Sequence, residues 1–93
     1  MITIVAKNII KEGKLEEFKA LAKEHVEKSR KEEGCIAFNL NEDINNKNVL
    51  TFIEEWENKE AIELHNKSAH FTTIIPKLGE LREQSEVNLY IRV

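Results

Sequence analysis

Short apolar and alternating stretches predict four β-strands along the chain. They cover residues 2–10, 36–41, 49–56 and 87–92. The stretch from Ile2 to Ile10 is rich in β-branched residues and almost continuously apolar, so its strand is expected to carry apolar side chains on both faces. The second and third stretches flank an Asn-rich segment from Asp43 to Asn48, which predicts a hairpin.

Between these stretches, apolar residues recur every three or four positions, as they do on one face of a helix. The first such set runs over Leu15–Ser29 and is followed by Gly34, which we expect to cap this helix in a left-handed conformation. Two further helical segments are expected after Asn58 and after Ser68, because both residue types are good N-caps. Pro76 is expected to bend or interrupt the last of them.

The order β-α-β-β-α-β predicts a ferredoxin-like α+β sandwich, in which one antiparallel four-stranded sheet carries its helices on one face. The strands offer apolar side chains to both faces, whereas the helices suffice to cover only one. An uncovered apolar face is typical of an interface, so we predict a homodimer that pairs sheet against sheet. A small cavity is expected between each sheet and its own helices.

Composition narrows the class of protein. With 93 residues, 41% hydrophobic and 33% charged, residues 1–93 are expected to form a single small domain. The net charge of -3 argues against a nucleic-acid binder.

No apolar run approaches the roughly 18 residues of a membrane span, and the N-terminus lacks the layout of a signal peptide, so a cytoplasmic protein with no membrane partner is expected. Cys35 has no partner for a disulfide and is interpreted as a small buried hydrophobe.

The three histidines of the chain are the candidate catalytic residues. His65 shares a helical stripe with Ala61 and Ile62 and should point towards the sheet, where it would act as a base or serve as a structural histidine bonded to a carbonyl. His70 is either catalytic or a helix-start residue that packs locally. His25 lies on the buried stripe of the first helix, as a core residue or as a ligand contact.

Other residues are candidates for holding a substrate or a cofactor. Asn8 lies within an apolar strand, and its buried amide needs partners, of which a substrate or an ordered water could be one. Trp56 could stack on an aromatic substrate or belong to the core. No metal site is expected, because His65 and His70 are five positions apart and no carboxylate or thiol is obviously convergent with them. The chain also lacks a Gly-rich loop for a nucleotide cofactor.

Several short motifs together resemble a known family. They are K-E-G-K at Lys11–Lys14, E-E-G-C at Glu32–Cys35, E-E-W at Glu54–Trp56, His65, and S-A-H-F at Ser68–Phe71. In this pattern the whole chain resembles the antibiotic biosynthesis monooxygenase (ABM) family, small proteins that form dimeric α+β barrels. In related haem-degrading enzymes a histidine binds the haem, and the matching position here is Ile75, so haem is not expected.

The resemblance implies a monooxygenase that needs no cofactor and oxidises a small phenolic or quinol substrate with dioxygen. His65, His70 and His25 would then be the catalytic candidates. Asn8, Trp56 and Phe71 would hold the substrate ring or its anion. Two other functions stay open: a cofactor-free isomerase or lyase acting on a small metabolite, and a dimer that binds a ligand without turnover.

Overall fold

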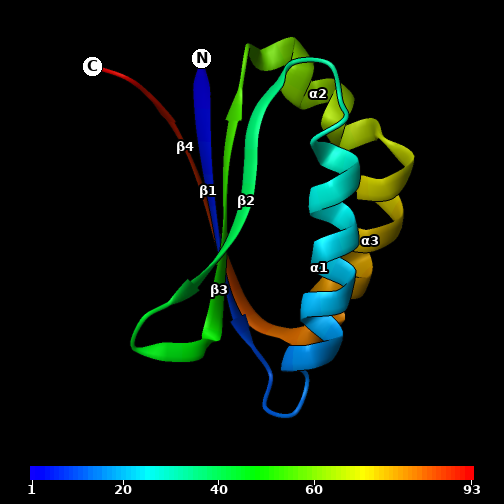
Figure 1. The fold of residues 1–93 in the computed structure, drawn as a ribbon, viewed down its shortest axis with the longest axis vertical. Helices are drawn as coiled ribbons and strands as arrows, with labels where there is room; N and C mark the ends of the chain where they lie inside the picture. Colours follow the sequence, from blue (N-terminus) through cyan, green and yellow to red (C-terminus); the bar gives the residue numbers. More distant parts are fainter.

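The computed structural model describes all 93 residues, which form one antiparallel sheet with three helices on one of its faces (Figure 1). The elements in chain order are β1 (Ile2–Ile10), α1 (Leu15–Ser29), β2 (Cys35–Asp43), β3 (Asn46–Trp56), α2 (Lys59–Lys67), α3 (Ala69–Leu81) and β4 (Arg82–Ile91). The strands lie in the order β2-β3-β1-β4. This architecture confirms the predicted ferredoxin-like α+β fold. None of the helices is both long enough and apolar enough to cross a membrane.

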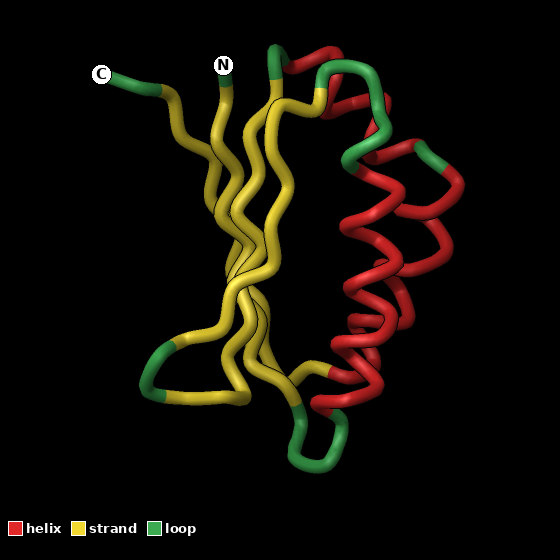
Figure 2. Tube along the Cα trace, viewed as in Figure 1, coloured by secondary structure: helices red, strands yellow, loops and turns green.

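The register of the sheet determines which side chains face the helices. Ile4 of β1 pairs with Glu54 of β3, and Asn8 of β1 pairs with Leu50 of β3. Because side chains alternate along a strand, Ile4, Ala6 and Asn8 share one face with their paired neighbours. All three helices lie on that side of the sheet (Figure 2). This face therefore carries the core, which includes the fully buried Phe18, Phe38, Trp56 and Leu78.

The helices leave the edge strand β4 uncovered. Val87 pairs with Ala6 and Leu89 pairs with Ile4, so both side chains point to the helix side of the sheet. They are nevertheless 57% and 55% exposed. The helical layer therefore ends short of β4, and an apolar strip of this strand stays open to solvent.

Both predicted helix caps are confirmed. The Asn58 side chain accepts a hydrogen bond from the Ala61 N–H at 2.9 Å, and the Ser68 hydroxyl accepts one from the Phe71 N–H at 3.3 Å. Ser68 ends α2 and begins α3 at the same time. The chain changes direction there. His65 and His70, five positions apart, can therefore point towards one another's surroundings, whereas on one continuous helix they would point in different directions.

Pro76 was expected to bend or interrupt the last helix. It does not interrupt α3, which continues through it from Ala69 to Leu81, and a bend of the helix axis stays a prediction. A proline inside a helix removes one hydrogen bond and crowds the carbonyl four residues earlier, here that of Thr72, so it costs stability without having to end the helix. β4 begins at Arg82, not at Val87, because the polar segment between them pairs with β1 through its backbone.

Gly34 was correctly expected to be left-handed, but its place was wrong. α1 ends at Ser29, with Arg30 as its C-cap, and Gly34 lies in the turn before β2 with a φ of +88°. Its carbonyl accepts a hydrogen bond from the Glu57 N–H at 2.9 Å. A Cβ at this position would meet the Cβ of Ala61 at 2.5 Å, so the turn packs directly on α2.

Candidate functional site

A cavity of about 220 Å³ lies between the sheet and the helices, as expected. Its apolar wall includes Ile4, Ala6, Phe52, Ile62, Phe71 and Ile75, and its polar side chains are Asn8, His25, Glu54, His65, Asn66 and Arg82. Val87 and Leu89 of the uncovered strip of β4 complete the wall. The cavity is therefore largely apolar, with a few ionisable groups, which is the usual character of a small-molecule site.

The structure brings four of the six residues that we singled out from the sequence to this cavity. They are Asn8, His25, His65 and Phe71. Trp56 and His70 do not line it. Trp56 is fully buried and packs against the ring of His65, with 4.6 Å between ring centroids.

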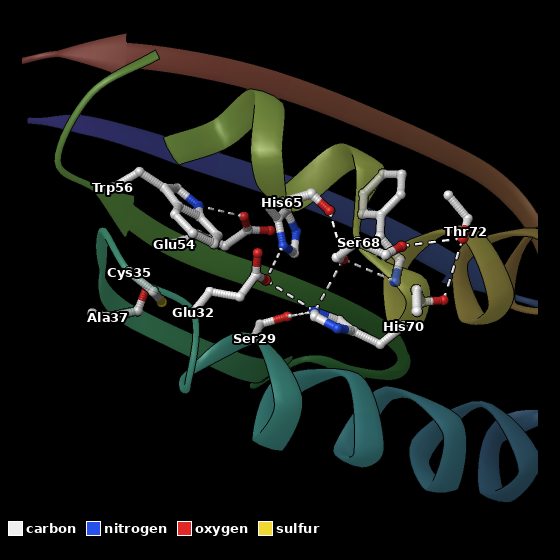
Figure 3. Close-up of polar contacts among 12 residues, drawn as sticks. Ser29, Glu32, Cys35, Ala37, Glu54, Trp56, His65, Ser68, His70 and Thr72 are labelled. Carbon is white, nitrogen blue, oxygen red and sulfur yellow. Dashed lines mark hydrogen bonds and ion pairs between the residues drawn. The ribbon is translucent and has the colours of Figure 1, made fainter. Parts of the chain in front are cut away.

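The side chain of Glu32 lies between two of the histidines (Figure 3). One carboxylate oxygen, Oε2, is 2.5 Å from His65 Nδ1 and 2.9 Å from His70 Nε2. The expectation that no carboxylate converges with these histidines was therefore wrong. Glu32 lies in the loop between α1 and β2, which brings its carboxylate to the histidines. The turn at Ser68 lets both His65 and His70 reach the same oxygen of this carboxylate.

His65 is a neutral imidazole beside Glu32. It is almost completely buried, and burial lowers its pKa, an effect that Glu32 only partly opposes. The ring is therefore assigned as neutral near pH 7, with its Nδ1–H donated to Glu32. This tautomer leaves Nε2 as the hydrogen-bond acceptor of a ring that lines the cavity.

His70 supports Glu32 from the other side. Its Nε2 is also 3.3 Å from the hydroxyls of Ser29 and of Ser68. The Ser68 hydroxyl donates to the His65 carbonyl at 2.7 Å, which ties the end of α2 to the same cluster. His70 therefore positions the Glu32 carboxylate and does not face the cavity itself.

His25 lies among aromatic rings at the centre of the site. Its ring centroid is 5.4 Å from those of Phe38, His65 and His70. Burial, followed by the proximity of His65 and His70, lowers the pKa of His25 to about 3. The ring is thus neutral, and its buried Nδ1 has no hydrogen-bond partner. A neutral imidazole of this kind can offer a hydrogen bond but cannot supply a positive charge at neutral pH.

Glu54 is an ionisable group of the cavity to which the sequence analysis gave no role. It is 6% exposed, and the indole Nε1–H of Trp56 donates to its Oε1 at 2.9 Å. Burial raises the pKa of Glu54 to about 7, although the Trp56 hydrogen bond acts in the opposite direction. Its alternation with Phe52 and Trp56 on β3 was a signal that this carboxyl faces the core.

Asn8 finds all its partners within the protein. Its side-chain N–H groups donate to the carbonyls of Ala6 and Leu50, each at 3.2 Å. Its Oδ1 accepts a hydrogen bond from the Arg82 guanidinium at 2.9 Å. Neither a substrate nor a water is needed to satisfy this amide, and Arg82 becomes a further residue of the site that the sequence analysis missed.

The raised pKa of Glu54 predicts a pH-dependent stability. Between about pH 4.5 and pH 7 the folded protein keeps a proton that the unfolded chain releases, so rising pH favours unfolding through this group. In Glu54→Gln the side-chain oxygen still accepts from Trp56, but nothing ionises. Urea unfolding of the wild type and of Glu54→Gln measures this effect. The free energy of unfolding of Glu54→Gln minus that of the wild type should therefore increase from pH 4 to pH 8. A difference that stays constant over this range would contradict the assignment.

Glu32, His65 and His70 are also the residues that could hold a metal ion, since their candidate ligand atoms lie within 4.8 Å of one another. Two histidines and a carboxylate form the ligand set of many non-haem iron sites. Such iron sites are octahedral, and neighbouring ligands about 2.1 Å from the metal then lie about 3.0 Å from one another. The 2.9 Å between Glu32 Oε2 and His70 Nε2 is close to this value, but the 2.5 Å between Glu32 Oε2 and His65 Nδ1 is that of a short hydrogen bond. In this geometry the three residues form a hydrogen-bonded cluster, and a metal would have to spread them.

Comparison with known proteins agrees with this architecture. A family model described as "Antibiotic biosynthesis monooxygenase" matches residues 1–77. A Bacillus subtilis protein named "Putative monooxygenase YcnE" is 36% identical over 81 residues, which are 87% of this chain and 85% of that protein. A Synechocystis protein, sll1783, is 36% identical over 89 residues. That match takes in 94% of this chain, which spans 60% of the length of the Synechocystis protein.

Solved structures show the same fold. A conserved protein from Methanosarcina mazei Go1 superposes with a TM-score of 0.96 at 38% identity, covering 99% of this chain and 92% of that one. A structure described as an antibiotic biosynthesis monooxygenase superposes with a TM-score of 0.95 at 32% identity, covering 100% of this chain and 99% of that one. The likeness therefore extends over the whole fold and is not confined to one motif.

Proposed function

The chain belongs to the antibiotic biosynthesis monooxygenase family, and from this premise we propose that it is a cofactor-independent monooxygenase that oxidises a small phenolic or quinol substrate with dioxygen. The observation that carries the proposal is that His65 lines a largely apolar cavity and is paired with Glu32 behind it. The pair supplies a base, and the cavity supplies a place for a ring.

The proposed reaction begins with removal of the substrate hydroxyl proton by His65 Nε2. Glu32 stabilises the imidazolium that forms, as the carboxylate does in other carboxylate–histidine pairs. The substrate anion then gives electrons to dioxygen. For an anthrone-like phenol, a CH₂ carbon becomes a carbonyl: one oxygen atom enters the substrate, the other leaves as water, and the substrate supplies all four electrons.

A cofactor-free isomerase or lyase is the second candidate. Glu54, with a pKa of about 7, and His65 both line the cavity and could serve as an acid and a base. Such an enzyme would turn over without oxygen. A dimer that only binds a ligand would show saturable binding and no turnover under either atmosphere.

Oxygen consumption with a panel of quinols and anthrone-like phenols tests the proposal. We expect uptake of one dioxygen per substrate oxidised, unchanged by a chelator, because Glu32 Oε2 and His65 Nδ1 lie closer together than two ligands of one metal ion would. Turnover that persists without oxygen would favour the isomerase or lyase. Loss of uptake on chelation, restored by a divalent metal, would refute the cofactor-free mechanism.

We also propose that the protein forms a homodimer through the sheet face opposite the helices. Val5 and Ile53 are paired in register on that face, and Ile53 is 41% exposed. The protein should therefore sediment at twice its monomer mass of 10.8 kDa, and Ile53→Lys should shift it towards the monomer. A wild-type protein that is a monodisperse monomer at micromolar concentration would contradict this prediction.

A further inference from the structure

We propose that Arg82, held in place by Asn8, forms a carboxylate-binding subsite at the end of the cavity opposite His65 and Glu54. The preferred substrate would then be a hydroxylated aromatic acid, with its hydroxyl at His65 and its carboxylate at Arg82. The position of the hydroxyl rests on the proposed function, whereas the carboxylate subsite rests on the geometry around Arg82 alone.

The register of the sheet separates the two ends. Glu54 is paired with Ile4, and Asn8 lies four residues further along the same strand, on the same face. At about 3.3 Å per residue, their backbones are about 13 Å apart. Between them the wall is apolar and includes Ala6, Phe52 and Phe71. The cavity therefore suits an elongated ligand that is polar at both ends and apolar in its middle.

Arg82 has no anionic partner within the protein. The four ion pairs of the molecule involve Lys19, Lys28, His65 and His70 as the basic residues. Arg82 is partly buried at the cavity wall, and although burial lowers its pKa, a guanidinium stays charged under all ordinary conditions. A partly desolvated charge without a counterion is unfavourable, so an anionic ligand would relieve that cost.

Asn8 orients the guanidinium towards the cavity. Its N–H groups are both engaged by the carbonyls of Ala6 and Leu50, which turns its Oδ1 towards Arg82. One guanidinium N–H is used in this contact, and the side chain has five. The remaining donors are arranged in a planar fork that matches the two oxygens of a carboxylate. No second basic side chain lines the cavity near it, so a singly charged carboxylate suits the subsite better than a phosphate.

Calorimetric titration with two matched ligands tests the subsite without requiring turnover. The probes are 6-hydroxy-2-naphthoate and its neutral carboxamide, which have nearly the same shape but differ at the far end, where an uncharged NH2 donor replaces one carboxylate oxygen. The wild type should bind the acid roughly 10- to 100-fold more tightly, as expected for a charge-assisted hydrogen-bonded pair. In Arg82→Gln the preference should fall to about one, while the glutamine amide can still donate to Asn8.

Two further variants serve as controls. Arg82→Lys keeps the charge without the planar fork and should retain part of the preference. Arg92→Gln removes an exposed positive charge outside the cavity, from the C-terminal end of the chain, and should leave the preference unchanged.

Several outcomes would overturn the subsite: equal affinity of the wild type for the acid and the amide, a preference that survives in Arg82→Gln, equal weakening of both ligands in that variant, or no binding of either ligand at millimolar concentration. A preference that depends on Arg82, together with no oxygen uptake on any substrate, would instead support the subsite and refute the monooxygenase. The two proposals can therefore fail separately.

Discussion

Replacing His65 with alanine is expected to lower the turnover number of the proposed oxygenation by roughly 10²- to 10⁴-fold, the usual contribution of a general base. The ring lines the cavity, and Glu32 accepts its Nδ1–H, so the imidazolium that forms is stabilised. Glu54 lines the cavity too, but its pKa of about 7 leaves it partly protonated at neutral pH, so it can replace His65 only in part. His25 is a poor substitute, because its pKa of about 3 makes it a very weak base. Oxygen-electrode kinetics at saturating substrate measure the effect.

His70→Gln is the comparison for this variant. His70 contacts the same oxygen of Glu32 but does not line the cavity, so its replacement should cost less turnover than the loss of His65. Circular dichroism should show that both variants keep the fold. Oxygen uptake by His65→Ala at the wild-type rate would remove His65 from the mechanism.

Gly34→Ala is expected to lower the free energy of unfolding by about 2 to 5 kcal/mol. A left-handed backbone costs a residue with a Cβ about 1 to 2 kcal/mol, and overpacking adds about 1 to 3 kcal/mol. Both penalties apply here, because Gly34 has a φ of +88° and its new Cβ would meet the Cβ of Ala61 at 2.5 Å. Urea unfolding monitored by the fluorescence of the buried Trp56 measures the loss.

The chain offers a matched control for Gly34. Gly13 has a φ of +82° but open space where a Cβ would lie, so Gly13→Ala should cost only the backbone penalty, about 1 to 2 kcal/mol. Adding Ala61→Gly to Gly34→Ala should restore part of the lost stability, since it removes the clashing methyl group. If Gly34→Ala and Gly13→Ala lower the free energy of unfolding by the same amount, the structure accommodates the new contact with Ala61 without loss of stability.

The fold could be predicted from the sequence because its signals are local. The nearly continuous run of β-branched and apolar residues in β1 and the caps at Asn58 and Ser68 act over a few neighbouring positions. The start of β4 could not be predicted in the same way. The segment from Arg82 is polar and owes its strand conformation to pairing with β1, which lies more than seventy positions earlier in the sequence.

The site was predictable only where its residues belong to periodic elements. The helical stripe of His65 predicted that its side chain points towards the sheet, and the alternation along β1 places Asn8 on the face that carries Ile4 and Ala6. Both side chains line the cavity. Glu32 lies in a loop, where no period indicates the direction of a side chain, and its contacts come from residues 33 and 38 positions away. Arg82 was missed because its partner, Asn8, is at the other end of the chain.

The open strip on β4 has a consequence for the kinetics of ligand exchange. Val87 and Leu89 belong to the cavity wall and are also more than half exposed, so the cavity meets solvent along this strand. A ligand can therefore arrive and depart over β4 without any displacement of the helices. Release of a bound ligand then needs no lid to open, and its rate is governed by the affinity of the cavity itself.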